Sequence, residues 1–271
     1  MSAMEFADRS VRARSFGAIA AEYDRFRPPP PDALVEWVLP ARCDAALDIG
    51  AGTGALTRAV VAHSGSVTAL EPDRRMSAVL AARETRARVV SARAEQLPVR
   101  DGCLDAVVGS SMWHWVDEAV AATEAARVLR PGGVLGLLWS GPDRSQGWLA
   151  EVLGGAARAL VERVERSELG EGAAVDQPRG TRRHRHEVHL PPGAPFAEPK
   201  TRVLAWSLTV TPAQLVGMAG TYSGFIVLPD DEKARVLEGV ADAVRNHPRL
   251  ADRDEIELPM RATAWRAVRN A

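Results

Sequence analysis

Glycines at alternate positions follow an acidic residue in one short stretch, "LDIGAGTG". Gly50, Gly52 and Gly54 come after Asp48 there, and an apolar run from Ala45 leads into them. Glycine suits close approach of a ligand to the backbone, because a side chain would block it and some φ angles would be forbidden. A strand that enters a helix through such a loop points backbone N–H groups at a ligand. The stretch therefore predicts a nucleotide-like site, with a plain strand-to-helix turn as the alternative.

Acidic residues narrow the kind of ligand. The glycine spacing is G-x-G-x-G rather than the G-x-G-x-x-G of dinucleotide sites, and Asp48 would be a poor neighbour for a pyrophosphate. Asp48 suits a ligand that carries an ammonium group. Glu71 ends the next apolar run, about where an acidic residue takes both hydroxyls of a ribose. A cationic ligand with a ribose and no phosphate fits better than NAD, although a solvated Glu71 remains the alternative.

Patterns along the rest of the chain predict the elements that position these residues. Apolar runs alternate with helical patterns, and this order implies a parallel sheet with right-handed crossovers. Strands are expected at 45–49, 66–70, 87–91, 103–111, 134–139, 202–210 and 255–268. Helices are expected at 16–26, 32–40, 54–65, 73–84, 117–130, 145–166, 211–222 and 230–248, with a glycine- and proline-rich loop before the sixth strand.

Composition argues against several partners. The 271 residues carry a formal net charge of -1, so no global field attracts nucleic acid. No run of about 18 apolar residues occurs, so no membrane span is expected. The N-terminal stretch "MSAMEFADRSVRARSFG" has no apolar core like that of a signal peptide. Cys43 and Cys103 are the only cysteines, and free thiols in a reducing, cytoplasmic location are expected.

Five motifs together resemble a known family. They are "LDIGAGTGALT", "VTALEPDRRM", "AEQLP", "LDAVVGSSMWHWVD" and "ARVLRPGGVLGLLW". In order and spacing they resemble the class I S-adenosylmethionine-dependent methyltransferases, above all the small-molecule group with trans-aconitate-like and ubiquinone/menaquinone-type enzymes. The resemblance covers Phe16 to Trp139, and "TYSGFIVLP" to "ELPMRATAW" is more loosely similar to actinobacterial members.

The resemblance implies a fold and a division of the chain. It implies an α/β, Rossmann-like, doubly wound and mostly parallel seven-stranded sheet with an antiparallel last strand. A single domain would span residues 1–271. Its parts would be a helical lid at 1–40, a cofactor-binding core at 41–140, an insertion after the fifth strand at 141–200, and strands and helices at 201–271 that complete the sheet.

The resemblance also implies where S-adenosylmethionine would lie. The glycine loop would follow its methionine part, with Asp48 near the ammonium group through water, and Glu71 would take both ribose hydroxyls. Members often carry Asp or Thr where this chain has Arg93, so the adenine contact is expected only from the backbone of Ala94. The full predicted cofactor set is Tyr23, Asp48, Gly50, Ala51, Gly52, Gly54, Glu71, Pro72, Ala94, Glu95 and Ser110.

A methyl acceptor would lie beyond the ends of the fourth and fifth strands. "SSMWHW" occupies this position, and His114 is the candidate general base because the pKa of an imidazole lies near neutrality. A packing histidine is the alternative. Trp113, Trp139 and Tyr222 are candidate substrate contacts, with core packing as the alternative for each.

Other functions and sites fit less well. "HRHEVH" offers His184, His186 and His189, but a solvated basic loop is expected rather than a metal site. The motifs of adenine and cytosine methylases are missing after the fourth strand. Methyl transfer to a small molecule, in secondary metabolism as one option, is the expected activity. A catalyst of cyclisation or rearrangement that keeps the cofactor as a scaffold, an NAD-dependent oxidoreductase and a binding module are the alternatives. The acceptor and the oligomeric state stay open.

Overall fold

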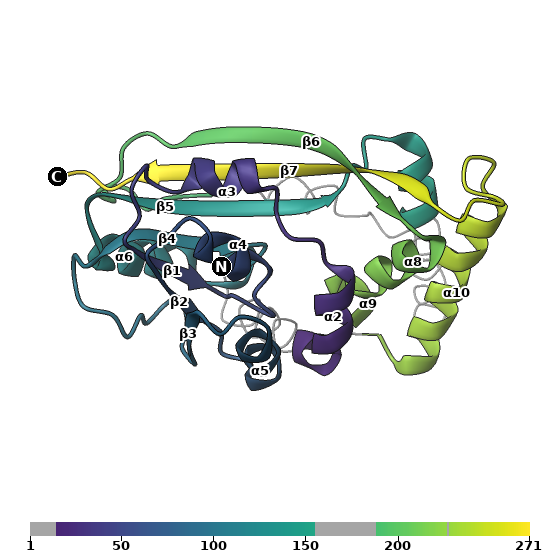
Figure 1. Ribbon diagram of the computed structural model, residues 1–271, viewed down its shortest axis with the longest axis horizontal. Helices are drawn as coiled ribbons and strands as arrows, with labels where there is room; N and C mark the ends of the chain where they lie inside the picture. Colours follow the sequence, from purple (N-terminus) through teal and green to yellow (C-terminus); the bar gives the residue numbers. More distant parts are fainter. Residues whose placement is uncertain (1–14, 155–187, 227) are drawn as a thin grey trace, which may run out of the picture. The chain divides into compact units, whose positions relative to one another are not determined.

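The computed structural model describes residues 15–154, 188–226 and 228–271 (Figure 1). Its strands are β1 (Ala45–Ile49), β2 (Ser66–Leu70), β3 (Ala87–Val90), β4 (Leu104–Ser110), β5 (Leu129–Pro142), β6 (Lys200–Val210) and β7 (Ile256–Val268). Its helices are η1 (Phe16–Ile19), α2 (Ala20–Phe26), α3 (Asp32–Val38), α4 (Ala55–Val61), α5 (Arg74–Arg83), η2 (Trp113–Trp115), α6 (Glu118–Val128), α8 (Pro212–Gly220), α9 (Ser223–Ile226) and α10 (Asp230–Asn246).

All seven strands belong to one sheet with the order β3-β2-β1-β4-β5-β7-β6. The pairs β1–β2, β1–β4, β2–β3 and β4–β5 are parallel. β7 runs the other way, because Gly132 N–H of β5 donates to Arg269 O while Asp143 N–H donates to Pro259 O. The predicted mostly parallel sheet with an antiparallel last strand is therefore confirmed.

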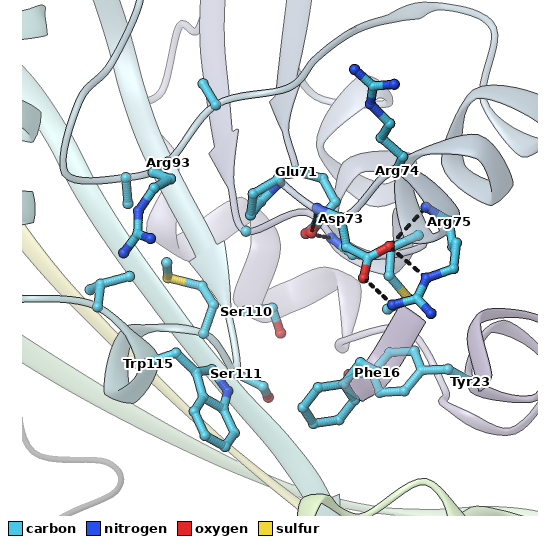
Figure 2. Close-up of a pocket in the computed structure, with 18 of the residues that line it drawn as sticks. Phe16, Tyr23, Glu71, Asp73, Arg74, Arg75, Arg93, Ser110, Ser111 and Trp115 are labelled. Atoms are coloured by element: carbon cyan, nitrogen blue, oxygen red, sulfur yellow. Dashed lines mark hydrogen bonds and ion pairs between the residues drawn. The ribbon is translucent and has the colours of Figure 1, made fainter. Parts of the chain in front are cut away.

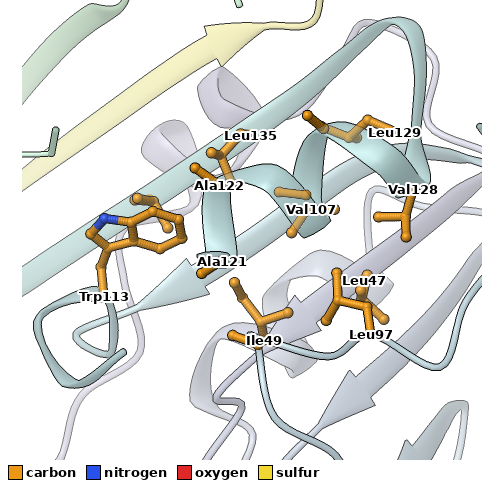
Figure 3. Packing of buried hydrophobic residues seen from close by; sticks show 14 of the residues in the cluster. Leu47, Ile49, Leu97, Val107, Trp113, Ala121, Ala122, Val128, Leu129 and Leu135 are labelled. Carbon is orange, nitrogen blue, oxygen red and sulfur yellow. The ribbon is translucent and has the colours of Figure 1, made fainter. Parts of the chain in front are cut away.

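Helices cover both faces of this sheet. Leu135 and Leu137 of β5 pack in one buried cluster with the alanines of α6 (Figure 3). Gly136 lies between them and faces the opposite side, where a Cβ on it would lie 2.7 Å from Val38 Cβ of α3. Alternate residues of a strand point to opposite faces. The doubly wound arrangement is therefore confirmed.

The fifth strand is longer than the sequence predicts. β5 begins at Leu129 and includes the residues of the "PGG" stretch, which the pattern placed after a helix end. Backbone pairing explains the difference, because Arg269 accepts from Gly132 N–H and donates to Gly133 O. The predicted helix at 145–166 is helical at 147–154, and its remaining residues lie outside the described part of the chain.

Contacts divide the chain into two compact units. The first comprises residues 1–141, 186–204 and 262–271, and the second comprises 142–185 and 205–261. In the second unit, α8 packs on α9 and α10, and α10 buries Val236, Val240 and Val244 along one side. The predicted single domain with its four parts stays a prediction. Within the described residues, no helix has the length and apolar character needed to cross a membrane.

Gly54 directly precedes α4, as its N-cap residue, in a left-handed conformation. Its φ is +88°, and a Cβ there would overlap Leu80 Cδ1 of α5, a side chain with no exposed surface. Gly102 has a similar φ of +59°, but a Cβ on it would meet nothing within 4 Å. A comparison of substitutions at these two glycines therefore separates the cost of the backbone conformation from the cost of crowding by Leu80.

We predict that Gly54→Ala is more destabilising than Gly102→Ala. Each substitution places a side chain in the left-handed region at a cost of about 1 kcal/mol. Gly54→Ala adds overpacking against Leu80, at about 1–3 kcal/mol. Urea unfolding of both variants measures the difference. Equal losses in free energy of unfolding would contradict the packing described for Gly54.

Candidate functional site

A cavity of about 530 Å³ lies in the first compact unit, at the carboxyl ends of β1, β2 and β4 (Figure 2). Its walls come from the glycine loop, the residues after β2 and β3, the end of β4, and Phe16 and Tyr23. A smaller cavity of about 60 Å³ shares Tyr23, Gly50 and Gly52 with it. Ligands of open α/β sheets bind at this edge of the sheet.

Glu71 directly follows β2 and is held by two backbone donors. Gly52 N–H donates to Oε2 at 2.9 Å, and Asp73 N–H donates to Oε1 at 2.8 Å. Burial raises the pKa of Glu71 above its usual value, and these two hydrogen bonds oppose the rise. Each carboxylate oxygen keeps a further acceptor site. The cavity therefore contains a fixed pair of acceptors, as a ribose diol requires.

Asp48 of β1 lines the smaller cavity and has no exposed surface. Thr57 of α4 donates its hydroxyl to Oδ2 at 2.6 Å, whereas Oδ1 has no hydrogen-bond partner within residues 15–154, 188–226 and 228–271. Burial raises the pKa of Asp48 to about 7, with the Thr57 hydrogen bond opposing the rise and the charge of Glu71 adding to it. A buried acceptor without a donor is rare in folded proteins. It fits a ligand amine, directly or through water.

The glycine loop is shaped for close approach. Gly50 and Gly52 have φ values of +60° and +58°, and a Cβ on Gly50 would lie 2.8 Å from Met112 Cβ. The backbone N–H of Ala51 donates to Leu70 O of β2, and Ala51 lines the smaller cavity. Gly54 faces Leu80 and is absent from the described lining of both cavities. Its predicted contact with the cofactor stays a prediction.

Residues after β3 form the far end of the larger cavity. Ala94 and Glu95 line it, as do Pro72 and Asp73 after β2. Arg93 pairs with Glu95 at 3.2 Å instead of offering an acceptor to the cavity. A guanidinium carries donors only. The expectation that only the backbone at position 94 meets the adenine edge is compatible with this pairing.

The N-terminal helices cover the cavity with aromatic rings. Phe16 lies edge-on to Tyr23 at 5.5 Å between ring centroids and to Trp115 at 6.0 Å. Asp24 of α2 anchors this layer, because it pairs with Arg58 of α4 at 3.1 Å and with Arg83 of α5 at 3.2 Å. Sequence reasoning missed Phe16 and Asp24 as parts of this layer. Only the amphipathic pattern around Phe16 and Tyr23 gave a signal for them.

The residues predicted to act on or contact the methyl acceptor lie in separate parts of the structure. Trp113 lies in the buried cluster under α6 with 1% of its surface exposed (Figure 3). Trp139 belongs to the same cluster and is 4% exposed. His114 lies beside Trp115, at 4.5 Å between ring centroids, and Trp115 lines the larger cavity. Tyr222 belongs to the second unit, where the Arg144 guanidinium lies 5.2 Å from its ring centroid. The roles of all four stay predictions.

The histidine-rich loop is only partly described. His184 and His186 lie outside the described residues. His189 is exposed, and its backbone N–H donates to Glu118 at 3.2 Å.

Of the eleven predicted cofactor residues, eight line the larger cavity: Tyr23, Gly50, Gly52, Glu71, Pro72, Ala94, Glu95 and Ser110. Asp48 and Ala51 line the smaller one.

Comparisons with known proteins agree on one family. A family model described as a methyltransferase domain matches residues 47–137. An uncharacterized methyltransferase of Mycobacterium tuberculosis is 35% identical over 254 residues, which cover 94% of this chain and 95% of the relative. A methyltransferase-like protein of Schizosaccharomyces pombe is 25% identical over 260 residues, with 94% and 95% covered.

Solved structures share the fold. A protein from Anaeromyxobacter dehalogenans, whose name assigns it to the type II methyltransferases, has a TM-score of 0.57 at 23% identity and covers 90% of this chain. The match covers 98% of the Anaeromyxobacter chain. The mycobacterial relative, which is named as a methyltransferase, matches nearly the whole of both chains, and this chain therefore belongs to the methyltransferase-domain family.

Proposed function

We propose that the protein transfers the methyl group of S-adenosylmethionine to a small-molecule acceptor. One observation supports this most: adjoining cavities bring together a diol acceptor at Glu71, a glycine cradle, and the unpartnered buried oxygen of Asp48. These groups match a nucleoside that carries an amino-acid group, and their negative charge would disfavour a pyrophosphate. The formal net charge of -1 favours a small acceptor over nucleic acid, and a cytoplasmic location and the trans-aconitate-like subgroup remain part of the proposal.

The chain's own residues orient the reactants. Glu71 would accept both ribose hydroxyls, Asp48 would accept from the ammonium group, and the backbone of Ala94 would meet the adenine. Bound S-adenosylmethionine supplies a sulfonium methyl group that is already activated for transfer. Alignment and exclusion of water are the remaining requirements for such a reaction.

The aromatic layer would exclude water from the reaction, and one histidine would accept a proton from the acceptor. Phe16, Tyr23 and Trp115 close one side of the larger cavity and would keep water from the sulfonium. An acceptor that must lose a proton needs a base within hydrogen-bond reach. His114, next to Trp115, is the candidate for this step.

Transfer of a labelled methyl group tests the proposed activity. The purified chain is incubated with methyl-labelled S-adenosylmethionine and a metabolite extract freed of protein and nucleic acid. We expect label in a small-molecule product, with one S-adenosylhomocysteine formed for each product. A product formed without label would favour the rearrangement alternative. Label found only in macromolecules of an unfractionated extract would contradict a small-molecule acceptor.

We predict that Glu71→Ala weakens binding of S-adenosylhomocysteine by about 1–3 kcal/mol, because the ribose hydroxyls lose their acceptors. Glu84→Ala is the matched control. Glu84 is also little exposed and accepts the backbone N–H of the residue two positions on, Arg86, but it is not among the described lining residues of either cavity. Isothermal titration calorimetry measures both. Unchanged affinity in Glu71→Ala, or equal losses in both variants, would contradict the role of Glu71.

We predict that affinity for S-adenosylhomocysteine rises with pH toward and through about 7. Asp48 is neutral below its pKa of about 7, so binding an ammonium group there first requires loss of a proton. The gain is at most about tenfold per pH unit. Asp48→Asn keeps an acceptor for Thr57 and removes the ionisation, so the pH slope should flatten. Calorimetry between about pH 5.5 and 7.5 in two buffers also detects the released proton. Equal pH slopes in both proteins would contradict the assignment.

The same raised pKa predicts how stability depends on pH without ligand. The pKa of Asp48 rises from 3.8 to about 7, so its protonated form is favoured by folding. The stability that it contributes is full below the lower value and is lost as pH rises through the higher one. Asp48→Asn should therefore gain stability relative to the wild type as pH rises, as urea unfolding would show.

A further inference from the structure

We propose that the hydroxyl group of Ser111 binds the methyl acceptor, and that this acceptor reacts through an oxygen or nitrogen atom. This inference deepens the proposed function and rests on the proposed placement of S-adenosylmethionine across the two cavities. Ser111 directly follows β4, is half-buried and lines both cavities.

Ser111 has a left-handed backbone conformation. Its φ is +54°, and Asp252, at +59°, is the other non-glycine residue with a positive φ in the described part of the chain. This conformation is uncommon for a residue with a Cβ and costs free energy, because the Cβ lies close to the following carbonyl oxygen. Residues strained in this way cluster at functional sites. The strain therefore indicates that the serine side chain provides something that glycine would not.

The turn after β4 accounts for the conformation of Ser111 but not for its side chain. The backbone N–H of Ser111 donates to Leu138 O of β5 at 2.8 Å, and the next residue, Met112, packs against Gly50 of the glycine loop. Glycine would adopt the same backbone conformation without strain. The Ser111 hydroxyl has no hydrogen-bond partner within residues 15–154, 188–226 and 228–271. A partner supplied by a ligand would explain why serine occupies this turn.

Ser111 lies where the two cavities meet. The residues that line both are Tyr23, Gly50, Gly52, Ser110 and Ser111. In the proposed placement, the sulfonium joins the nucleoside in the larger cavity to the amino-acid part beside Asp48, so it would lie at this junction. The Ser111 hydroxyl would therefore lie beside the methyl group that is transferred.

The surroundings of Ser111 suit an acceptor with an apolar body and a polar reacting atom. Phe16 and Trp115 also line the larger cavity, with ring centroids 6.0 Å apart, and Figure 2 draws Ser111 in the same region of the cavity as these rings. The rings offer apolar surface, and a serine hydroxyl offers one donor and two acceptor sites. A sulfonium is a cation that accepts no hydrogen bond, so the hydroxyl is available to the acceptor.

A hydrogen bond from Ser111 would align the acceptor for transfer. A lone pair of the acceptor atom forms the bond to the methyl carbon, and the electron pair of the broken S–C bond stays on sulfur. A proton that the acceptor loses goes to a base, for which His114 is the candidate. An oxygen or nitrogen nucleophile has a further lone pair or an N–H or O–H for the serine, whereas a carbon nucleophile does not. Alignment of this kind raises the rate of the transfer step.

Two substitutions separate the hydroxyl from the backbone conformation. Ser111→Ala removes the hydroxyl and keeps the strain, whereas Ser111→Gly removes both. We expect each variant to transfer labelled methyl groups to the small-molecule fraction of the metabolite extract at least about tenfold more slowly than the wild type. Their affinity for S-adenosylhomocysteine, measured by calorimetry, should stay within about threefold of the wild-type value.

The other outcomes of this experiment are equally decisive. An unchanged transfer rate in both variants would overturn the proposal. A loss of S-adenosylhomocysteine affinity as large as the loss of rate would assign Ser111 to the cofactor and would also overturn it. Absence of label transfer by the wild type would instead overturn the proposed function, and this inference with it.

Asp252 provides the matched control for strain, because it has a similar φ and is not among the described lining residues of either cavity. At both positions the glycine variant should have a higher urea midpoint than the alanine variant, since glycine relieves the left-handed conformation. Asp252→Ala and Asp252→Gly should keep the wild-type transfer rate. A loss of transfer in Ser111→Ala that Ser111→Gly restores would show a structural role and overturn the proposal.

The product tests the predicted class of acceptor. Mass spectrometric fragmentation of the labelled product locates the transferred methyl group. We expect the label on oxygen or nitrogen. A methyl group on carbon would overturn the assignment of Ser111 to the reacting atom of the acceptor.

Discussion

Two hydrogen bonds to one carboxylate tie together the parts of the proposed cofactor site. Glu71 accepts from Gly52 in the loop after β1 and from Asp73 at the start of α5. The carboxylate thus sets the distance between the glycine cradle and the segment that follows β2. Because both of its oxygens are held by backbone, its free acceptor sites cannot turn away from the cavity. The remaining features of the site are arranged around this fixed group.

Burial of two acids near each other creates a demand for a cationic ligand. Asp48 and Glu71 both have raised pKa values, with burial as the largest cause in each, and the charge of Glu71 adds to the shift at Asp48. A buried charge is costly unless it is paired. A ligand ammonium would relieve this cost. The two buried acids therefore favour binding of a cationic ligand, and their negative charge disfavours a phosphate in the same cavity.

Sequence patterns could predict those parts of the fold and the candidate site that depend on residues close together in the chain. The glycine spacing, the carboxylate at the end of β2 and the alternation of strands and helices are all encoded within short stretches. The contact of Asp24 with Arg58 and Arg83 joins residues far apart in the chain, and the meeting of Phe16 with Trp115 depends on how η1 docks. Trp113 and Trp139 were predicted as acceptor contacts with core packing as the alternative. Both are buried in the cluster with α6, and their contact with an acceptor stays a prediction. The extension of β5 depends on pairing with the distant Arg269.

A crystal structure with S-adenosylhomocysteine bound tests the central claim most directly. The account predicts both ribose hydroxyls within hydrogen-bond distance of the Glu71 carboxylate, with the amino-acid group in the smaller cavity beside Asp48. A ligand whose ribose lies away from Glu71, or a cavity that stays empty at saturating ligand, would contradict it.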